Sequence, residues 1–115
     1  MARVKRGFKA RRRRKRLLEL AKGFYGRSKN TIRQGHSAVD NALQYAYIGR
    51  KQRKRDFRAL WNQRIGAAVK AQGLSYSRFI HALKIKNIEL DRKILADLAV
   101  YYPNDFSKVV ELAKS

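Results

Sequence analysis

The sequence has no cysteine, a single proline at position 103, and only 8 acidic residues among its 115 positions. Without cysteine, the chain can have no disulfide bond, no thiolate metal ligand and no catalytic thiol. Between residues 31 and 72 there is no proline at all, so nothing of that kind interrupts a helix there. No window alternates apolar and polar residues with a period of two for long enough to predict a strand.

The chain also lacks a long hydrophobic run. The apolar residues that follow the basic N-terminus, between Leu17 and Ala21, are interrupted by Glu19 and are too few for the core of a signal peptide. No segment approaches the roughly 18 apolar residues that a membrane-spanning helix needs. We therefore expect a soluble, intracellular protein with no membrane segment.

Residues that could form a catalytic or metal site are scarce. His36 and His81 lie 45 positions apart without an acidic cluster, whereas a zinc or catalytic site needs several ligands close together. The glycine motifs G-x-x-x-x-G-K-[ST] and G-x-G-x-x-G are both absent. Glu89 and Asp91 are explained by helix capping and salt bridging. We expect no enzyme, no metal and no cofactor, with His36 contacting nucleic acid or solvent and His81 at a domain edge.

What the chain does have is positive charge, distributed unevenly. It carries 29 Lys and Arg against 8 acids, a net charge of +21, which predicts a polyanionic partner. Residues 1–58 hold 20 of these cations and three acids, whereas residues 59–115 hold nine and five. Only the second part can bury a core by itself, although about 60 residues make a marginal one. We therefore predict a basic extension at 1–58 and a globular domain at 59–115.

The first 30 residues combine a cationic segment with a glycine-rich turn. Residues 1–16 carry ten cations and no acid, so we expect them to be disordered in isolation and to take their shape from a partner. Residues 9–22 favour a helix, which Gly23 would end. In the turn that follows, Phe24 and Tyr25 could stack on an unpaired base or pack against the next helix, and the sequence leaves both open.

One long helix is predicted over residues 31–72, capped by Asn30 or Thr31 and weakened but not ended by three glycines. Its apolar residues share one face at 39–47 and again at 57–69, with cations on that face between them. The cations of 50–58 together span more than half of the helix circumference. A helix buried in protein cannot carry such a ring of charge, whereas a helix between nucleic-acid strands can.

Three shorter helices are predicted after Gly73, at 76–86, 92–101 and 104–114, with Ser75 and Asp91 as caps of the first two. They would bury a core together with the end of the long helix. The expected core residues are Phe57, Leu60, Trp61, Ile65, Ala68, Val69, Phe79, Ile80, Leu83, Ile94, Leu95, Leu98, Phe106, Val109, Val110 and Ala113. The predicted fold class is therefore all-α: a long basic N-terminal helical extension that continues into a small globular helical C-terminal domain.

Three polyanions fit this charge: structured RNA, duplex DNA and an anionic membrane surface. A membrane is the weakest candidate, because a membrane-surface helix has one wide apolar face, whereas cations surround the helix at 50–58. An extended arm joined to a small anchor suits the crevices of a folded RNA. Duplex DNA is more often bound by a dimer, and nothing here indicates a homo-oligomer. RNA is therefore favoured, and an architectural DNA-binding protein is the alternative.

Six runs of sequence carry a family resemblance. They are MARVKRG at 1–7, AKGFYGR at 21–27, QYAY at 44–47, GRKQRKRDFRALW at 49–61, GLSYSRFIHAL at 73–83 and DRKILADLAV at 91–100. Over nearly its whole length, the chain resembles the bacterial-type large-subunit ribosomal protein twenty family. It departs from the family pattern at Asn62, where a branched apolar residue is usual, and at Gly66, where an asparagine is usual.

The resemblance implies a structural ribosomal protein that binds 23S ribosomal RNA and is not catalytic. In that family the N-terminal extension penetrates the RNA, and the C-terminal domain binds an RNA helix junction near the surface. The family acts early in large-subunit assembly, and members can repress their own translation by binding their messenger RNA. The implied location is the cytoplasmic ribosome of a bacterium or its organellar equivalent, beside large-subunit proteins thirteen and twenty-one.

The predicted RNA contacts are mostly cations, chosen by their clustering in the extension and by their places in the C-terminal helices. Most lie within the extension, where Tyr25 and His36 are added. The set is Arg3, Lys5, Arg6, Lys9, Arg11, Arg12, Arg13, Arg14, Lys15, Arg16, Lys22, Tyr25, Arg27, Lys29, Arg33, His36, Arg50, Lys51, Arg53, Lys54, Arg55, Arg58, Arg78, Lys84, Lys86, Arg92 and Lys93.

Overall fold

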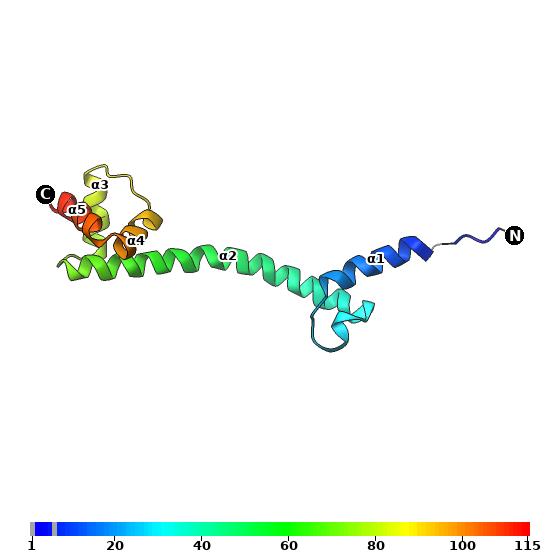
Figure 1. Ribbon diagram of the computed structural model, residues 1–115. Helices are drawn as coiled ribbons and strands as arrows, with labels where there is room; N and C mark the ends of the chain where they lie inside the picture. Colours follow the sequence, from blue (N-terminus) through cyan, green and yellow to red (C-terminus); the bar gives the residue numbers. More distant parts are fainter. Residues whose placement is uncertain (1, 6) are drawn as a thin grey trace. The chain divides into compact units, whose positions relative to one another are not determined.

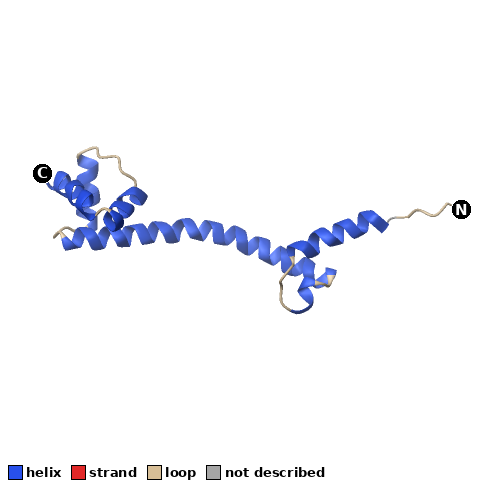
Figure 2. Ribbon diagram, viewed as in Figure 1, coloured by secondary structure: helices blue, strands red, loops and turns tan. Residues whose placement is uncertain are grey.

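The structure is a computed structural model, and it describes residues 2–5 and 7–115. Over these residues all regular structure is helical and no strand is present, which confirms the all-α prediction (Figure 2). The elements are α1 (Gly7–Leu20), a short 3-10 helix η1 (Gly26–Lys29), α2 (Ile32–Ala71), α3 (Tyr76–Ile85), α4 (Arg92–Tyr101) and α5 (Pro103–Lys114) (Figure 1). The chain divides into two compact units between Lys51 and Gln52.

The helix ends follow the local signals in the sequence closely. Gly23, with a φ of +85°, closes the turn that follows α1, and Gly73, with a φ of +81°, lies in the turn that follows α2. Both values lie in the left-handed region that glycine enters without a steric penalty. The largest shift is in α1, which covers 7–20 instead of the predicted 9–22. Residues 7–16 are helical in this structure. The expectation that they are disordered in isolation is therefore a prediction that α1 is unstable without a partner.

In the first unit, α1 and the start of α2 share a small apolar contact. The buried hydrophobic side chains there, among the described residues, are Ala21, in the turn just after α1, and Val39 on α2. Gly35, on α2, is buried as well. A Cβ at this position would lie 2.9 Å from the backbone oxygen of Ser28 and 3.5 Å from Leu18 Cδ2. A side chain would therefore collide with the loop backbone. Gly35 therefore permits the close approach of the loop to α2. The sequence had predicted only that this glycine weakens the helix.

The middle of α2 is exposed on all sides. From Leu43 to Ala59 every residue is exposed, including the apolar side chains at 43, 45, 47, 48 and 57. The apolar face predicted at 39–47 is thus covered by protein only at its beginning, where Val39 is buried and Ala42 is half-buried. The helix continues through Gly49, where a Cβ would meet nothing within 4 Å.

The second unit has a true hydrophobic core between the end of α2 and the helices α3, α4 and α5. Phe79 and Phe106 lie at its centre with ring centroids 5.8 Å apart. The core residues are Ile65, Val69, Phe79, Leu83, Leu95, Ala96, Phe106, Val110 and Ala113. The predicted caps of α3 and α4 are confirmed: Ser75 Oγ accepts a hydrogen bond from the amide of Arg78 at 3.4 Å, and Asp91 Oδ1 accepts one from the amide of Ile94 at 2.8 Å.

Two predicted core residues are wrong. Phe57 is 48% exposed, because burial along α2 begins only at Leu60. Ile94 is 47% exposed, because the face that α4 buries is formed by Leu95 and the neighbouring Ala96, which had not been predicted. In both cases helical periodicity gave the right helix, but the position of neighbouring helices decided which side chains are covered.

The two departures from the family pattern have a local structural consequence. Asn62 Oδ1 accepts a hydrogen bond of 2.8 Å from the hydroxyl of Tyr76. A Cβ on Gly66 would lie 4.0 Å from the Cβ of Tyr76, an ordinary van der Waals distance. The polar residue at 62 is therefore satisfied within the protein, and the glycine at 66 is not required by a close contact.

Candidate nucleic-acid interface

Exposure is the first property that the predicted contacts of the extension share. The structure leaves every one of their side chains exposed wherever it describes them between residues 3 and 58. Arg6 lies outside the described residues. Within residues 2–5 and 7–115, Lys108 forms an ion pair with Asp105, and His36, which carries charge only when protonated, contacts Asp40. The charge of the extension is therefore not balanced by acids of the same chain, and it faces outward.

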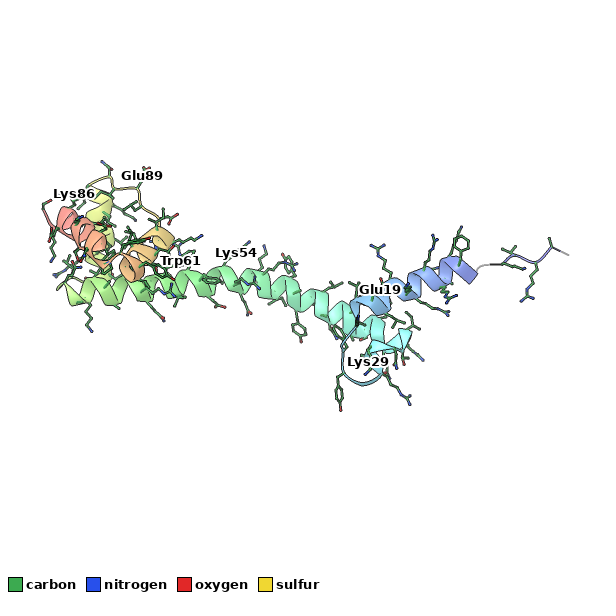
Figure 3. All side chains as sticks on the ribbon, in the orientation of Figure 1. Glu19, Lys29, Lys54, Trp61, Lys86 and Glu89 are labelled. Atoms are coloured by element: carbon green, nitrogen blue, oxygen red, sulfur yellow. The ribbon has the colours of Figure 1, made fainter. Side chains whose placement is uncertain are left out.

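Cations of α1 and of the turn that follows it line an open hollow together with apolar side chains. Its lining includes Arg11, Arg14, Lys15, Lys22 and Lys29, with Ala10 and Leu18 between them. Spacings of three and four residues place the cations of α1 along one face, and Lys29 joins them from η1. Figure 3 labels Lys29, at the end of η1, and Glu19, the single acid of the lining, on α1. Such a row of cations is suited to phosphates that follow one another along a strand.

The glycine-rich turn separates its two aromatic residues. Phe24 is half-buried, whereas Tyr25 is 99% exposed between Gly23 and Gly26, both of which have positive φ. Packing on the next helix is therefore ruled out for the Tyr25 ring, because a packed ring cannot be fully exposed. An exposed tyrosine beside cations has the chemistry of a base-stacking residue.

Other exposed aromatic residues on the extension were not predicted as contacts. The guanidinium of Arg12 lies 5.4 Å from the ring centroid of Phe8, and Lys51 Nζ lies 5.3 Å from that of Tyr47. These are cation–π distances. Tyr45 is exposed as well. The signal that could have found these rings is aromatic residues interleaved with cations on a helix that has no protein cover.

His36 has an acidic partner, Asp40, that was not predicted. Its Nδ1 lies 2.9 Å from Asp40 Oδ2, and both side chains are exposed. The spacing of four residues on a helix could have predicted this contact. The carboxylate occupies one ring nitrogen of the imidazole, and the second ring nitrogen is a further hydrogen-bonding group of this exposed side chain. The contact of His36 with nucleic acid stays a prediction.

In the second unit, most predicted cations are exposed and two also act within the protein. Arg78, Lys84 and Lys93 are exposed on α3 and α4. Lys86 Nζ donates to Ser115 Oγ at 3.0 Å, and the half-buried Arg92 donates from Nε to the Tyr76 hydroxyl at 3.0 Å. These two are held in place by the fold, unlike the long side chains on α1.

Two cations left out of the prediction have roles inside the fold. Lys114 Nζ donates to the backbone oxygen of Gln72 at 2.9 Å, at the end of α2 where carbonyl groups lack helical partners. Lys108 Nζ donates to Asp105 at 2.9 Å. His81 is exposed on α3. Lys108 and Lys114 therefore bond to other groups of the protein, as Lys86 and Arg92 do.

Neither a metal site nor a membrane segment is found where the structure describes the chain. Over residues 2–5 and 7–115, no three His, Asp or Glu side chains are grouped to hold a metal ion. No helix in the same ranges combines the length and apolar content needed to cross a bilayer.

Comparison with known proteins identifies the family. The chain matches the family described as ribosomal protein L20 over residues 3–109. It is 57% identical over 113 residues to the large ribosomal subunit protein bL20 of Desulfovibrio desulfuricans, covering 98% of this chain and 96% of that protein. It is 60% identical over 111 residues to the bL20 of Desulfosudis oleivorans, covering 96% of each chain, and 58% identical over 115 residues to that of Geobacter sulfurreducens, covering 100% and 98%. The chain belongs to the ribosomal protein L20 family.

Proposed function

We propose that this protein is a structural constituent of the large ribosomal subunit and that it binds 23S ribosomal RNA directly. The subunit assignment is supported by family membership and by the printed names of relatives that align over nearly their full length. Direct RNA binding is supported above all by the exposed cations of residues 1–58. Those side chains have no acidic partners among the described residues except for His36.

The proposed mechanism is neutralisation of phosphates where RNA segments converge. Each phosphate contact releases counterions and adds about 0.7–0.9 to the slope of log K against log salt. Cations on several sides of α2 between Arg50 and Arg58 could meet phosphates of more than one RNA segment. The protein supplies charge and shape in this mechanism and no chemical step, as befits a family of ribosomal proteins and not of enzymes.

The proposed division of labour follows exposure along α2. Residues 1–58 form the RNA-penetrating extension, and 59–115 form the globular RNA-binding domain. Residues 52–58 are assigned to the second compact unit, but they are exposed, and burial begins at Leu60. This supports a functional boundary close to position 59. The second domain would recognise RNA shape with Arg78, Lys84, Lys86, Arg92 and Lys93.

Three finer roles belong to the same proposal. The first is support of early subunit assembly, because cations that neutralise converging phosphates favour compaction of the RNA. The second is contact with large-subunit proteins thirteen and twenty-one as neighbours in the cytoplasmic ribosome. The third is autogenous repression, in which the protein binds its own messenger RNA. All three rest on the family resemblance.

Competition binding tests this proposal against its alternative, an architectural DNA-binding protein. The full chain is bound to folded 23S ribosomal RNA and challenged with duplex DNA at equal nucleotide concentration. We expect the RNA to retain the protein, because an extension with cations on several sides fits internal crevices better than the outside of a duplex. Displacement by DNA at equal concentration would contradict the proposal and favour the alternative.

A further inference from the structure

Phe57 and Trp61 form an aromatic pair on the last exposed turns of α2. Their ring centroids are 6.4 Å apart, and the rings are inclined at 36°. Trp61 is half-buried and packs against the core of the second unit, whereas Phe57 is about half-exposed. The pair therefore joins the protein core to an apolar surface that no part of the described chain covers.

The two rings line an open hollow on the surface of α2. It is lined by Arg53, Lys54, Arg55, Phe57, Arg58 and Trp61. Four of the six residues are cationic, two are aromatic, and none is acidic. Figure 3 shows Lys54 and Trp61 on this stretch of α2. The hollow thus has aromatic rings with positive charges around them.

The chemistry of the hollow selects among possible occupants. A purely apolar protein surface would have to cover the four cationic groups, which is costly unless each is paired. A simple polyanion would satisfy the cations but would leave the Phe57 ring in water. A nucleotide satisfies both, because its phosphate pairs with guanidinium groups and its base has a flat face that stacks on aromatic rings.

We propose that this hollow binds one unpaired nucleotide of RNA, with its base on the ring of Phe57 and its phosphate held by the neighbouring arginines. This inference rests on the proposed RNA-binding function and deepens it. Residues 53–61 would then bind an unstacked base in addition to the phosphates of the RNA backbone. It also explains why an aromatic residue stands among cations at position 57 although the core does not use it.

Trp61 provides a direct probe, because it is the only tryptophan in the chain. The full chain is titrated with a single-stranded oligoadenylate of about twelve nucleotides and with an abasic strand of the same length, within the site sizes known for such binding. We expect quenching of Trp61 fluorescence by the oligoadenylate and much less by the abasic strand at equal saturation. Equal quenching by both strands would contradict base stacking at this site.

Matched variants distinguish stacking on the aromatic ring of Phe57 from a general hydrophobic contact at this position. Phe57→Leu should lower the affinity for the oligoadenylate by about 5- to 150-fold, the loss expected for one stacked base, whereas Phe57→Tyr should keep it. Tyr101→Leu removes another exposed ring of the same unit, outside the hollow, and should change nothing. Equal affinity of Phe57→Leu and the unaltered chain would overturn the proposal.

The outcomes also distinguish this inference from the proposed function. If Phe57→Leu keeps its affinity for folded 23S ribosomal RNA and for both single strands, the base site is absent while RNA binding stands. If the unaltered chain fails to bind any RNA, the proposed function itself fails. If an apolar helical peptide without anionic groups quenched Trp61 and the oligoadenylate did not, the hollow would be a protein-binding surface and the inference would be wrong.

Discussion

Arg92 donates a hydrogen bond of 3.0 Å from Nε to the hydroxyl of Tyr76, and that hydroxyl donates one of 2.8 Å to Asn62. The three residues belong to α4, α3 and α2, so this chain of bonds links three helices of the second unit. A guanidinium has five N–H donors, and the bond to Tyr76 uses one of them. Arg92 can therefore be oriented by the fold and still bind a phosphate.

Replacing Tyr76 by phenylalanine tests this link. The change removes one hydroxyl that both donates and accepts, so we expect the free energy of unfolding to fall by about 1 kcal/mol. RNA affinity should fall as well, because the Arg92 side chain loses its orientation. Urea denaturation and RNA titration measure the two effects. Tyr101→Phe, at an exposed position of the same unit, is the control, and equal behaviour of the two variants would contradict the link.

Gly35 and Gly49 form a matched pair within one helix. Alanine is favoured over glycine in helices by roughly 0.5–1 kcal/mol, so Gly49→Ala, whose Cβ meets nothing within 4 Å, should stabilise α2. Gly35→Ala should instead destabilise the first unit, since its Cβ would stand 2.9 Å from the Ser28 backbone oxygen. Amide hydrogen exchange at Ala21 and Val39 measures the stability of the first unit in each variant. The same sign for both variants would refute the close-approach explanation.

The salt dependence of RNA binding distinguishes cations on the interface from cations used by the fold. Arg53→Gln should lower the slope of log K against log salt by about 0.7–0.9, the value for one phosphate contact. Lys108→Gln is the control, because Lys108 is bonded to Asp105 at 2.9 Å, and its slope should be unchanged. An unchanged slope for Arg53→Gln would remove this residue from the interface.

Limited proteolysis with trypsin tests where the free protein is stable. Helix α1 has no buried residue, so we expect rapid cleavage within residues 1–30 and protection over about 60–113, where the core lies. Digestion of the denatured chain shows that sites in the second region can be cut. Bound RNA should protect residues 1–30. Uniform protection of the free chain would contradict a partner-stabilised extension.

The helices could be predicted because their ends depend on neighbouring residues. Ser75, Asp91 and the glycines at 23 and 73 act within a few positions of themselves, so the sequence contains the whole signal. The importance of Gly35 could not be predicted in this way. It depends on the Ser28 backbone, which comes close only when the turn has formed.

Burial and side-chain partners were predicted less well than helices. Phe57 and Ile94 lie on apolar stripes of their helices, yet both are about half-exposed. Whether a stripe is covered depends on where the neighbouring helices lie, and the periodicity of one helix carries no information about that. The bond from Arg92 to Tyr76 joins residues 16 positions apart and required the fold. His36 with Asp40, in contrast, could have been predicted from a spacing of four. The cations themselves were predictable, because their number alone requires exposure.

Sedimentation in high salt tests the central claim that this chain is a structural RNA-binding component of the large ribosomal subunit. The tagged full chain is expressed in cells, and ribosomal subunits are separated on gradients at high salt. We predict that the protein stays with the large subunit, because cations enclosed by RNA exchange slowly with bulk ions. Its absence from the large-subunit fraction, with recovery at the top of the gradient or with DNA, would contradict the claim.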